Sequence, residues 1–140
     1  MLKKLIFLLS FIFLKDCTYA QAFNSVHVYI LNLKSFYTIK IDKDIIKNET
    51  APFLVSNPKA AGSIFRILTD DIRGKAIGHA NDYAEIRLLV EFFLEGKLSR
   101  FISLTSDKLI YSDGKLFECS NEDLIKLNSY IDRLTIRLGY

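Results

Sequence analysis

Two short turn signals in the second half of the chain constrain its fold more than any other feature. Glu95-Gly96-Lys97 and Ser112-Asp113-Gly114 each separate stretches that are rich in apolar, β-branched and aromatic residues. Short turns with glycine between such stretches join antiparallel neighbours in a hairpin. The sequence therefore predicts two hairpins between residues 83 and 119.

The first strand of this region, Tyr83–Glu95, admits two assignments. Apolar residues at alternate positions are interleaved with Glu85, Arg87 and Glu91, which favours a strand. As a helix, the same segment would begin with a capping box of Asp82 and Glu85 and carry its apolar residues in one stripe. We favour the strand. Three further strands are predicted over Leu98–Leu104, Lys108–Tyr111 and Lys115–Cys119.

Two helices are predicted. Ser120 and Asp123 form a capping box at the start of the clearer one. Its apolar residues recur at spacings of three and four, at Leu124, Leu127, Ile131, Leu134 and Leu138. Asn57 and Pro58 mark the start of the other helix, because asparagine is a good N-cap and proline suits the first turn. That helix is expected to end at Thr69–Asp71.

The remaining segments complete an α+β fold. Strands are predicted over Ser25–Lys34 and Phe36–Ile41, a connection over Asp42–Ser56 with an edge strand at Phe53–Val55, and a long exposed loop over Ile72–Asp82. We expect one α+β domain over residues 21–140. Its antiparallel sheet of five or six strands carries two helices, and the C-terminal helix packs on one sheet face.

Residues 1–20 have the layout of a secretory signal peptide. Two lysines precede the apolar run Leu5–Leu14, and Thr18 and Ala20 stand at the −3 and −1 positions of a cleavage site before Gln21. A ten-residue helix would span about half of a ~30 Å hydrocarbon core, which is too short for a permanent membrane span. Cleavage after Ala20 is expected to leave a periplasmic or secreted protein.

This leader changes what charge and cysteine content imply. The chain has a formal net charge of +3, but its first 20 residues hold three lysines and one aspartate, which leaves +1. A nearly neutral domain is not expected to bind nucleic acid or an anionic membrane. Cys17 leaves with the leader, and Asp16 before it disfavours lipid attachment. Cys119 is expected to be a small buried residue.

Few residues carry recognisable chemistry. His79 lies in the 72–82 loop, with Asp70, Asp71 and Asp82 near it in sequence. That set lacks the spacing of a known metal site, and the chain has no nucleophile elbow or phosphate-binding loop. We therefore expect no catalytic, cofactor or metal-binding residues. The alternative is a small metal-dependent or hydrolytic enzyme centred on His79.

Two surfaces are expected to bind a partner. Leu89, Phe93 and Phe101 fall on the sheet face opposite the main apolar set, and an apolar face left uncovered by the first helix marks a partner site. The other surface is the loop after that helix, with the polar residues Asp70, Asp71, Arg73, His79 and Asp82.

These bounds favour a binding protein over an enzyme. A small, nearly neutral, exported α+β domain fits a periplasmic immunity or inhibitor protein, although this is an analogy of design and no family motif supports it. Its partner would be a protein such as a cell-envelope toxin or hydrolase. A second alternative is a structural subunit of an envelope assembly, joined through a sheet edge.

Overall fold

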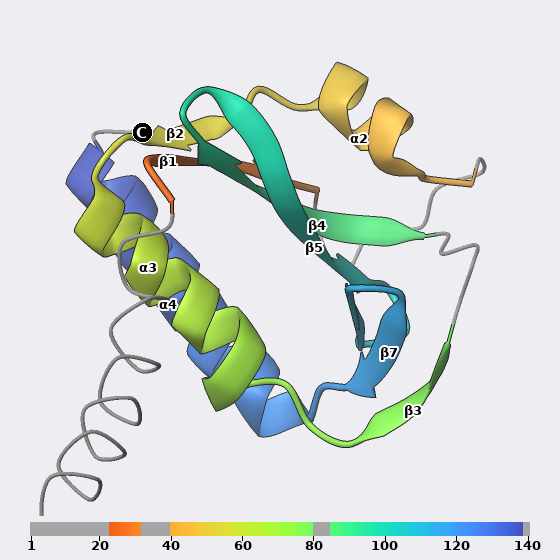
Figure 1. The fold of residues 1–140 in the computed structure, drawn as a ribbon. Coiled ribbons are helices and arrows are strands. Elements are labelled where there is room, and N and C mark those ends of the chain that lie inside the picture. The colour runs from red at the N-terminus through yellow and green to blue at the C-terminus, as the bar shows by residue number, and fades with distance from the viewer. Residues whose placement is uncertain (1–22, 32–39, 80–84, 139–140) are drawn as a thin grey trace, which may run out of the picture.

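The computed structural model describes residues 23–31, 40–79 and 85–138, with side chains of the last helix as far as Arg133. This part of the chain forms an antiparallel sheet and three helices (Figure 1). In spatial order the seven strands are β2 (Phe53–Val55), β1 (Ser25–Ile30), β4 (Ile86–Leu94), β5 (Lys97–Thr105), β6 (Leu109–Ser112), β7 (Lys115–Glu118) and β3 (Ala76–His79). The helices are α2 (Lys43–Glu49), α3 (Pro58–Arg66) and α4 (Asn121–Leu138).

The predicted α+β class with an antiparallel sheet is confirmed, but the number of elements is larger than expected. The described residues form seven strands instead of five or six, and three helices instead of two. The additional helix is α2, which lies in the segment predicted as the connection Asp42–Ser56. The edge strand predicted within that segment is confirmed as β2.

Both predicted hairpins form, as β4–β5 and β6–β7. Their turn residues have positive φ angles, 51° and 76° at Glu95 and Gly96, and 51° and 78° at Asp113 and Gly114. Two successive positive φ angles define the type I′ turn, whose twist matches that of the flanking strands. The strand assignment is also confirmed over Ile86–Leu94, where β4 pairs with β5, whereas residues 83 and 84 lie outside the described residues.

Alternation along the central strands sends side chains into two separate cores. On one face, Val26, Val28, Leu88 and Val90 pack with α3 and with Leu127 of α4. On the other face a second core cluster contains Tyr29, Leu31, Ile41, Ile46, Ile86 and Leu89. Since Ile46 belongs to α2, this helix covers part of the second sheet face (Figure 1).

α2 is a short helix whose start is fixed by a cap. The Asp42 side chain accepts hydrogen bonds from the backbone N–H groups of Asp44 and Ile45, each at 3.0 Å. Only Ile46 of its seven residues is buried. One buried position gives no apolar periodicity, so the segment reads as a polar connection.

Two other expectations need correction. Residues 76–79, predicted within a loop, form the edge strand β3, which pairs with β7. All four residues of β3 are exposed, so no alternation marks the strand in the sequence. The predicted strand Phe36–Ile41 falls largely outside the described residues. Its last two residues, Lys40 and Ile41, are not in a strand, and Ile41 belongs to the second core cluster.

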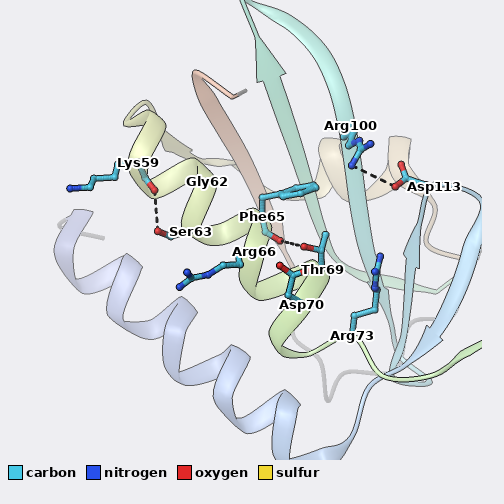
Figure 2. A pocket seen from close by; sticks show the side chains of 10 residues that line it. All are labelled: Lys59, Gly62, Ser63, Phe65, Arg66, Thr69, Asp70, Arg73, Arg100 and Asp113. Carbon is cyan, nitrogen blue, oxygen red and sulfur yellow. Dashed lines mark hydrogen bonds and ion pairs between the residues drawn. The ribbon is translucent and has the colours of Figure 1, made fainter. Parts of the chain in front are cut away.

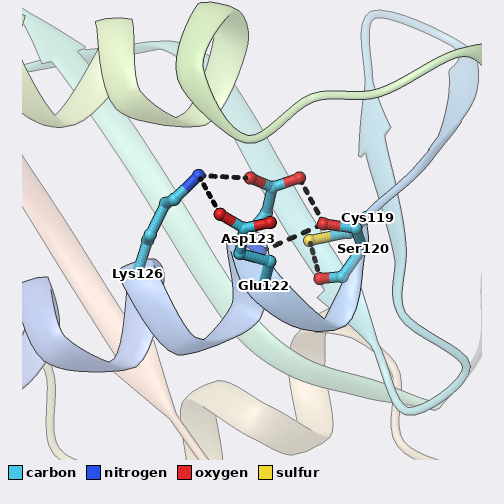
Figure 3. A network of polar contacts seen from close by, with 5 residues as sticks. All are labelled: Cys119, Ser120, Glu122, Asp123 and Lys126. Carbon is cyan, nitrogen blue, oxygen red and sulfur yellow. Dashed lines mark hydrogen bonds and ion pairs between the residues drawn. The ribbon is translucent and has the colours of Figure 1, made fainter.

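α4 begins at the predicted capping box (Figure 3). The Asp123 backbone N–H donates to Ser120 Oγ at 3.1 Å, and the Ser120 hydroxyl donates to the Asp123 carboxylate at 2.6 Å. That second hydrogen bond lowers the pKa of Asp123. Leu127 is buried in the first core, whereas packing of the whole helix across the sheet stays a prediction.

The N-terminal leader lies outside the described residues. The signal peptide over residues 1–20, its cleavage after Ala20 and the fate of Cys17 therefore stay predictions. In the described part of the chain, no helix is long and apolar enough to cross a membrane.

Gly74, which leads into β3, lies against the backbone of β7. Its N–H donates to the Glu118 carbonyl oxygen at 2.8 Å, and a Cβ atom at this position would lie 2.7 Å from the same oxygen. We expect Gly74→Ala to lower the free energy of unfolding by about 1–3 kcal/mol, because backbone must shift to relieve the clash. Urea denaturation measures the change. Gly78→Ala is the matched control, since a Cβ there meets nothing within 4 Å, and equal unfolding midpoints would contradict the close approach.

Candidate functional site

The candidate site is built on α3 and the π-helical turn that continues it, η1 (Ile67–Asp71). Asn57 caps α3 as predicted, accepting from the Lys59 and Ala60 N–H groups at 2.9 and 3.2 Å. At the other end, the Ile72 N–H donates to the Ile67 carbonyl, five residues back. A π turn rotates the following side chains out of α-helical register and is frequent at functional sites. The predicted helix end at Thr69–Asp71 is confirmed.

A groove of about 640 Å³ runs along this helix (Figure 2). The α3–η1 side and its C-terminal extension contribute Lys59, Gly62, Ser63, Phe65, Arg66, Thr69, Asp70 and Arg73. Arg100 of β5 and Asp113 of the β6–β7 turn line the sheet side. Four of these side chains are cationic and two are anionic, so the groove is a positively charged concavity on a nearly neutral domain.

Arg100 is held at the groove by an aromatic ring and by one loosely paired carboxylate. Its guanidinium carbon lies 5.5 Å from the centroid of the Phe65 ring, within the range of a cation–π interaction. Its Nη1 atom lies 3.7 Å from Oδ2 of Asp113, which is beyond ordinary hydrogen-bond length. Both side chains are partly exposed, 38% and 56%, so water screens the pair.

Arg73 approaches the same region from the helix side. Its guanidinium carbon lies 4.3 Å from the centroid of the Phe117 ring. Figure 2 shows the side chain directed toward the Arg100–Asp113 pair, whereas Lys59 and Arg66 extend along the flank of α3 away from β5. Two guanidinium groups are thus directed toward the same part of the groove.

The rings behind these guanidinium groups are anchored in the first core. Phe117 is buried, and Phe65 makes an edge-to-face contact with the fully buried Phe92 at 5.2 Å between centroids. Arginine side chains packed on fixed rings lose less conformational freedom when they bind a ligand. The groove is therefore partly preorganised.

The hydroxyl groups in the groove take part in the helix itself. Ser63 Oγ donates to the Lys59 carbonyl at 3.0 Å, and Thr69 Oγ1 donates to the Phe65 carbonyl at 2.9 Å. A catalytic hydroxyl instead donates its proton to a general base. The groove therefore offers charge and hydrogen-bonding edges to a ligand, and its hydroxyl protons are already engaged.

The structure brings together only part of the predicted loop surface. Asp70 and Arg73 line the groove. Asp71 is exposed at the end of η1, and His79 is exposed at the end of β3, but neither is among the lining residues. Asp82 lies outside the described residues.

The predicted aromatic face is largely occupied by the protein's own elements. Leu89 is fully buried in the second core cluster and offers no surface to a partner. Phe93 is half-buried, with its ring centroid 4.3 Å from that of His27. Phe101 is also half-buried, with the Lys43 ammonium 4.2 Å from its ring centroid. These three residues do not border the groove.

Several groove residues escaped the sequence analysis, although part of the signal was present. Lys59 and Arg66 are spaced seven residues apart, which places both basic side chains on one face of α3, whereas Arg73 was predicted and follows the π turn. Arg100 and Asp113 carry no such signal. They meet because β5 pairs with β6 and the type I′ turn projects Asp113 beside β5.

Cys119 is buried as expected, with 6% of its surface exposed. Burial raises the pKa of its thiol to about 11, with a smaller contribution from Asp123. A thiol with this pKa is almost entirely protonated at neutral pH and is a poor nucleophile. Figure 3 shows its sulfur directed toward the Ser120 backbone at the start of α4.

The Cys119 pKa predicts a loss of stability in alkaline solution. The folded protein keeps the thiol proton up to about pH 11, whereas the unfolded chain releases it near pH 9. The free energy of unfolding is therefore expected to fall between these values by about 2–3 kcal/mol from this group. Urea denaturation from pH 8 to 11 measures the decline. Cys119→Ala should make it shallower by this amount, and parallel curves for the two proteins would contradict the buried thiol.

Comparison with known proteins adds no identification: no protein-family model, characterised protein or solved structure matches this chain. Over residues 23–31, 40–79 and 85–138, no group of three or more His, Cys, Asp and Glu side chains is arranged to hold a metal ion. Function must therefore be argued from the groove.

Proposed function

We propose that this chain is a small exported binding protein that binds and blocks a protein partner, in the manner of periplasmic immunity and inhibitor proteins. The observation that carries the proposal is the groove, where Arg73 and Arg100 lie over core aromatic rings and the nearest carboxylate, Asp113, is only loosely paired with Arg100. Fixed charges with incomplete pairing favour recognition of a complementary charged partner.

The chemistry of the lining favours binding over catalysis. Both groove hydroxyls donate to helix carbonyls, which leaves them without the proton acceptor that a nucleophile needs. His79, the centre of the alternative enzyme hypothesis, stands on the exposed edge strand. His79→Ala tests that hypothesis, because an activity or a bound metal that this variant lost would favour the enzyme.

The surroundings of the groove favour a protein as the ligand. The helix that forms one wall continues through Asp71 into β3, where all four residues are exposed and Ile77 is 46% exposed. A concave charged site next to exposed apolar and backbone groups provides the rim of a protein interface.

The same edge strand supports a second candidate, a structural subunit of an envelope assembly. Among the described strands β3 is the last of the sheet, so its outer backbone groups are able to pair with another strand. Size-exclusion chromatography separates the two candidates. Concentration-dependent oligomers of the purified protein would favour the subunit, and a monomer at all concentrations would favour the inhibitor.

Export is tested by the N-terminus of the protein that a bacterial host produces from the full chain with a C-terminal tag. We expect intact-mass measurement of the periplasmic fraction to show removal of residues 1–20. A chain that keeps Met1 and remains with the cytoplasmic fraction would contradict export.

Partner binding is tested by affinity capture from an envelope extract of the source cells. The proposal predicts one protein recovered in stoichiometric amount and released by high salt, because exposed charge pairs are screened at high ionic strength. A folded protein that recovers no partner would overturn the inhibitor function.

A further inference from the structure

We propose that the groove binds a carboxylate of an acidic segment on the protein partner, between Arg73 and Arg100, and that Asp113 occupies this place in the free protein. This inference rests on the proposed function and names the chemistry of the partner. Asp113 is then an internal competitor that the partner displaces.

The charged side chains of the groove are incompletely paired. Arg73 and Arg100 are directed toward one region, and Asp113 lies 3.7 Å from Arg100. Within the described residues, Arg73 forms no hydrogen bond and no ion pair. An arginine–carboxylate pair at hydrogen-bond distance, with two parallel N–H donors, is considerably stronger than this separated pair. A carboxylate that comes within hydrogen-bond distance of Arg100 therefore binds it more strongly than Asp113 does and displaces Asp113.

Both arginine side chains also contact aromatic rings. The guanidinium carbons of Arg73 and Arg100 lie over the Phe117 and Phe65 rings, at 4.3 and 5.5 Å from the ring centroids. Stacking on a ring leaves the N–H groups at the guanidinium edge available to an acceptor. The flat, forked donors of arginine suit a carboxylate, whereas a lysine ammonium is a point charge.

The two aspartates that line the groove favour a carboxylate ligand over a phosphate ligand. Asp70 and Asp113 both line the groove. A phosphate group carries about −1.5 to −2 charges at neutral pH and is repelled by both carboxylates. A singly charged side chain meets less repulsion and replaces one carboxylate with another. The concave shape also suits a protruding acidic side chain.

The turn that holds Asp113 allows a clean test of the displacement. Asp113 and Gly114 occupy the central positions of a type I′ turn, with φ angles of 51° and 78°. Asn-Gly is the most favoured pair in this turn, so Asp113→Asn keeps the backbone and removes only the charge. The variant is expected to fold as the original protein does.

The experiment is an NMR titration of ¹⁵N-labelled protein, purified from cells expressing the full chain, that follows the side-chain Nε–H signals of Arg73 and Arg100. The probes are a six-residue glutamate peptide, a six-residue glutamine peptide and inorganic phosphate. We expect the glutamate peptide alone to shift both signals in a saturable way. Asp113→Asn should tighten its binding about three- to tenfold. Arg73→Gln with Arg100→Gln should abolish binding, while Lys97→Gln, an exposed position at the start of β5 that does not line the groove, should not change it.

The outcomes are distinct. Unchanged or weaker binding by Asp113→Asn would overturn the displacement by Asp113. Tighter binding of phosphate than of the glutamate peptide would overturn the choice of a protein carboxylate. Saturable peptide binding with no protein recovered from the envelope extract would support the carboxylate site and reject the inhibitor function. If the protein captured a partner but did not bind the glutamate peptide, the inhibitor function would be supported and the carboxylate site would be rejected.

Discussion

Leu89→Ala is expected to lower the free energy of unfolding by about 2–5 kcal/mol. Leu89 is fully buried among Tyr29, Ile41, Ile46 and Ile86, between the sheet and α2. Truncation removes its apolar contacts and leaves a cavity that the strand backbone cannot close. The midpoint of urea denaturation measures the loss.

The neighbouring strand provides a matched control for Leu89. Leu98 of β5 is also a leucine in a strand, but 50% of its surface is exposed. Leu98→Ala is expected to change the unfolding free energy by less than about 1 kcal/mol. If both substitutions had equally small effects, α2 would not cover the second sheet face, and that face would again be a candidate docking surface.

Lys47→Ala is expected to destabilise the protein by about 1–3 kcal/mol, because it leaves a carboxylate buried without its cation. Lys47 of α2 lies 2.8 Å from Oε1 of Glu91 in β4. The Glu91 side chain is only 5% exposed, while that of Lys47 is 39% exposed. Solvent access to the lysine keeps the expected effect below that of a fully buried pair.

A double substitution separates the ion pair from simple loss of packing. Lys47→Met with Glu91→Gln removes both charges and keeps an amide beside Tyr29, which hydrogen-bonds to Glu91. We expect stability within about 1 kcal/mol of the original protein. If the double variant were as unstable as Lys47→Ala, an unpaired carboxylate would not be the cause.

The pair also has a defined pH dependence. The hydrogen bond to Glu91 raises the pKa of Lys47 above its ordinary value of 10.5. The folded state holds this proton more tightly than the unfolded chain, so the contribution is complete at neutral pH and is lost only as the pH rises above about 10.5. The Lys47→Met and Glu91→Gln double variant should lack this part of the alkaline decline.

The sequence predicts elements best where a local signal fixes them. The type I′ turns at Glu95-Gly96 and Asp113-Gly114, the Asn57 cap and the Ser120 capping box all form at the expected residues. Each signal arises from contacts within a few residues, so the sequence alone contains it. The alternation of side chains between the two sheet faces along β1 and β4 is likewise visible in the sequence alone.

Elements without apolar periodicity were missed. α2 buries one residue, because it is a short helix that covers part of one sheet face. β3 buries none, because it is an edge strand. The positions of α2 and β3 depend on which sheet face and which sheet edge the other elements leave uncovered. The candidate site shares this property, since Arg100 and Asp113 meet Arg73 only after β5, β6 and β7 have paired. Of the eight docking residues predicted from the sequence, Asp70 and Arg73 line the groove, five others do not, and Asp82 lies outside the described residues.

Recognition of an acidic protein partner by the groove is tested by repeating the envelope capture with two charge reversals. Arg73→Glu changes the groove, and Lys97→Glu makes the same change of charge at the exposed end of the β4–β5 hairpin. We expect Arg73→Glu to lose the stoichiometric partner and Lys97→Glu to retain it. Equal recovery of the partner by both variants would contradict it.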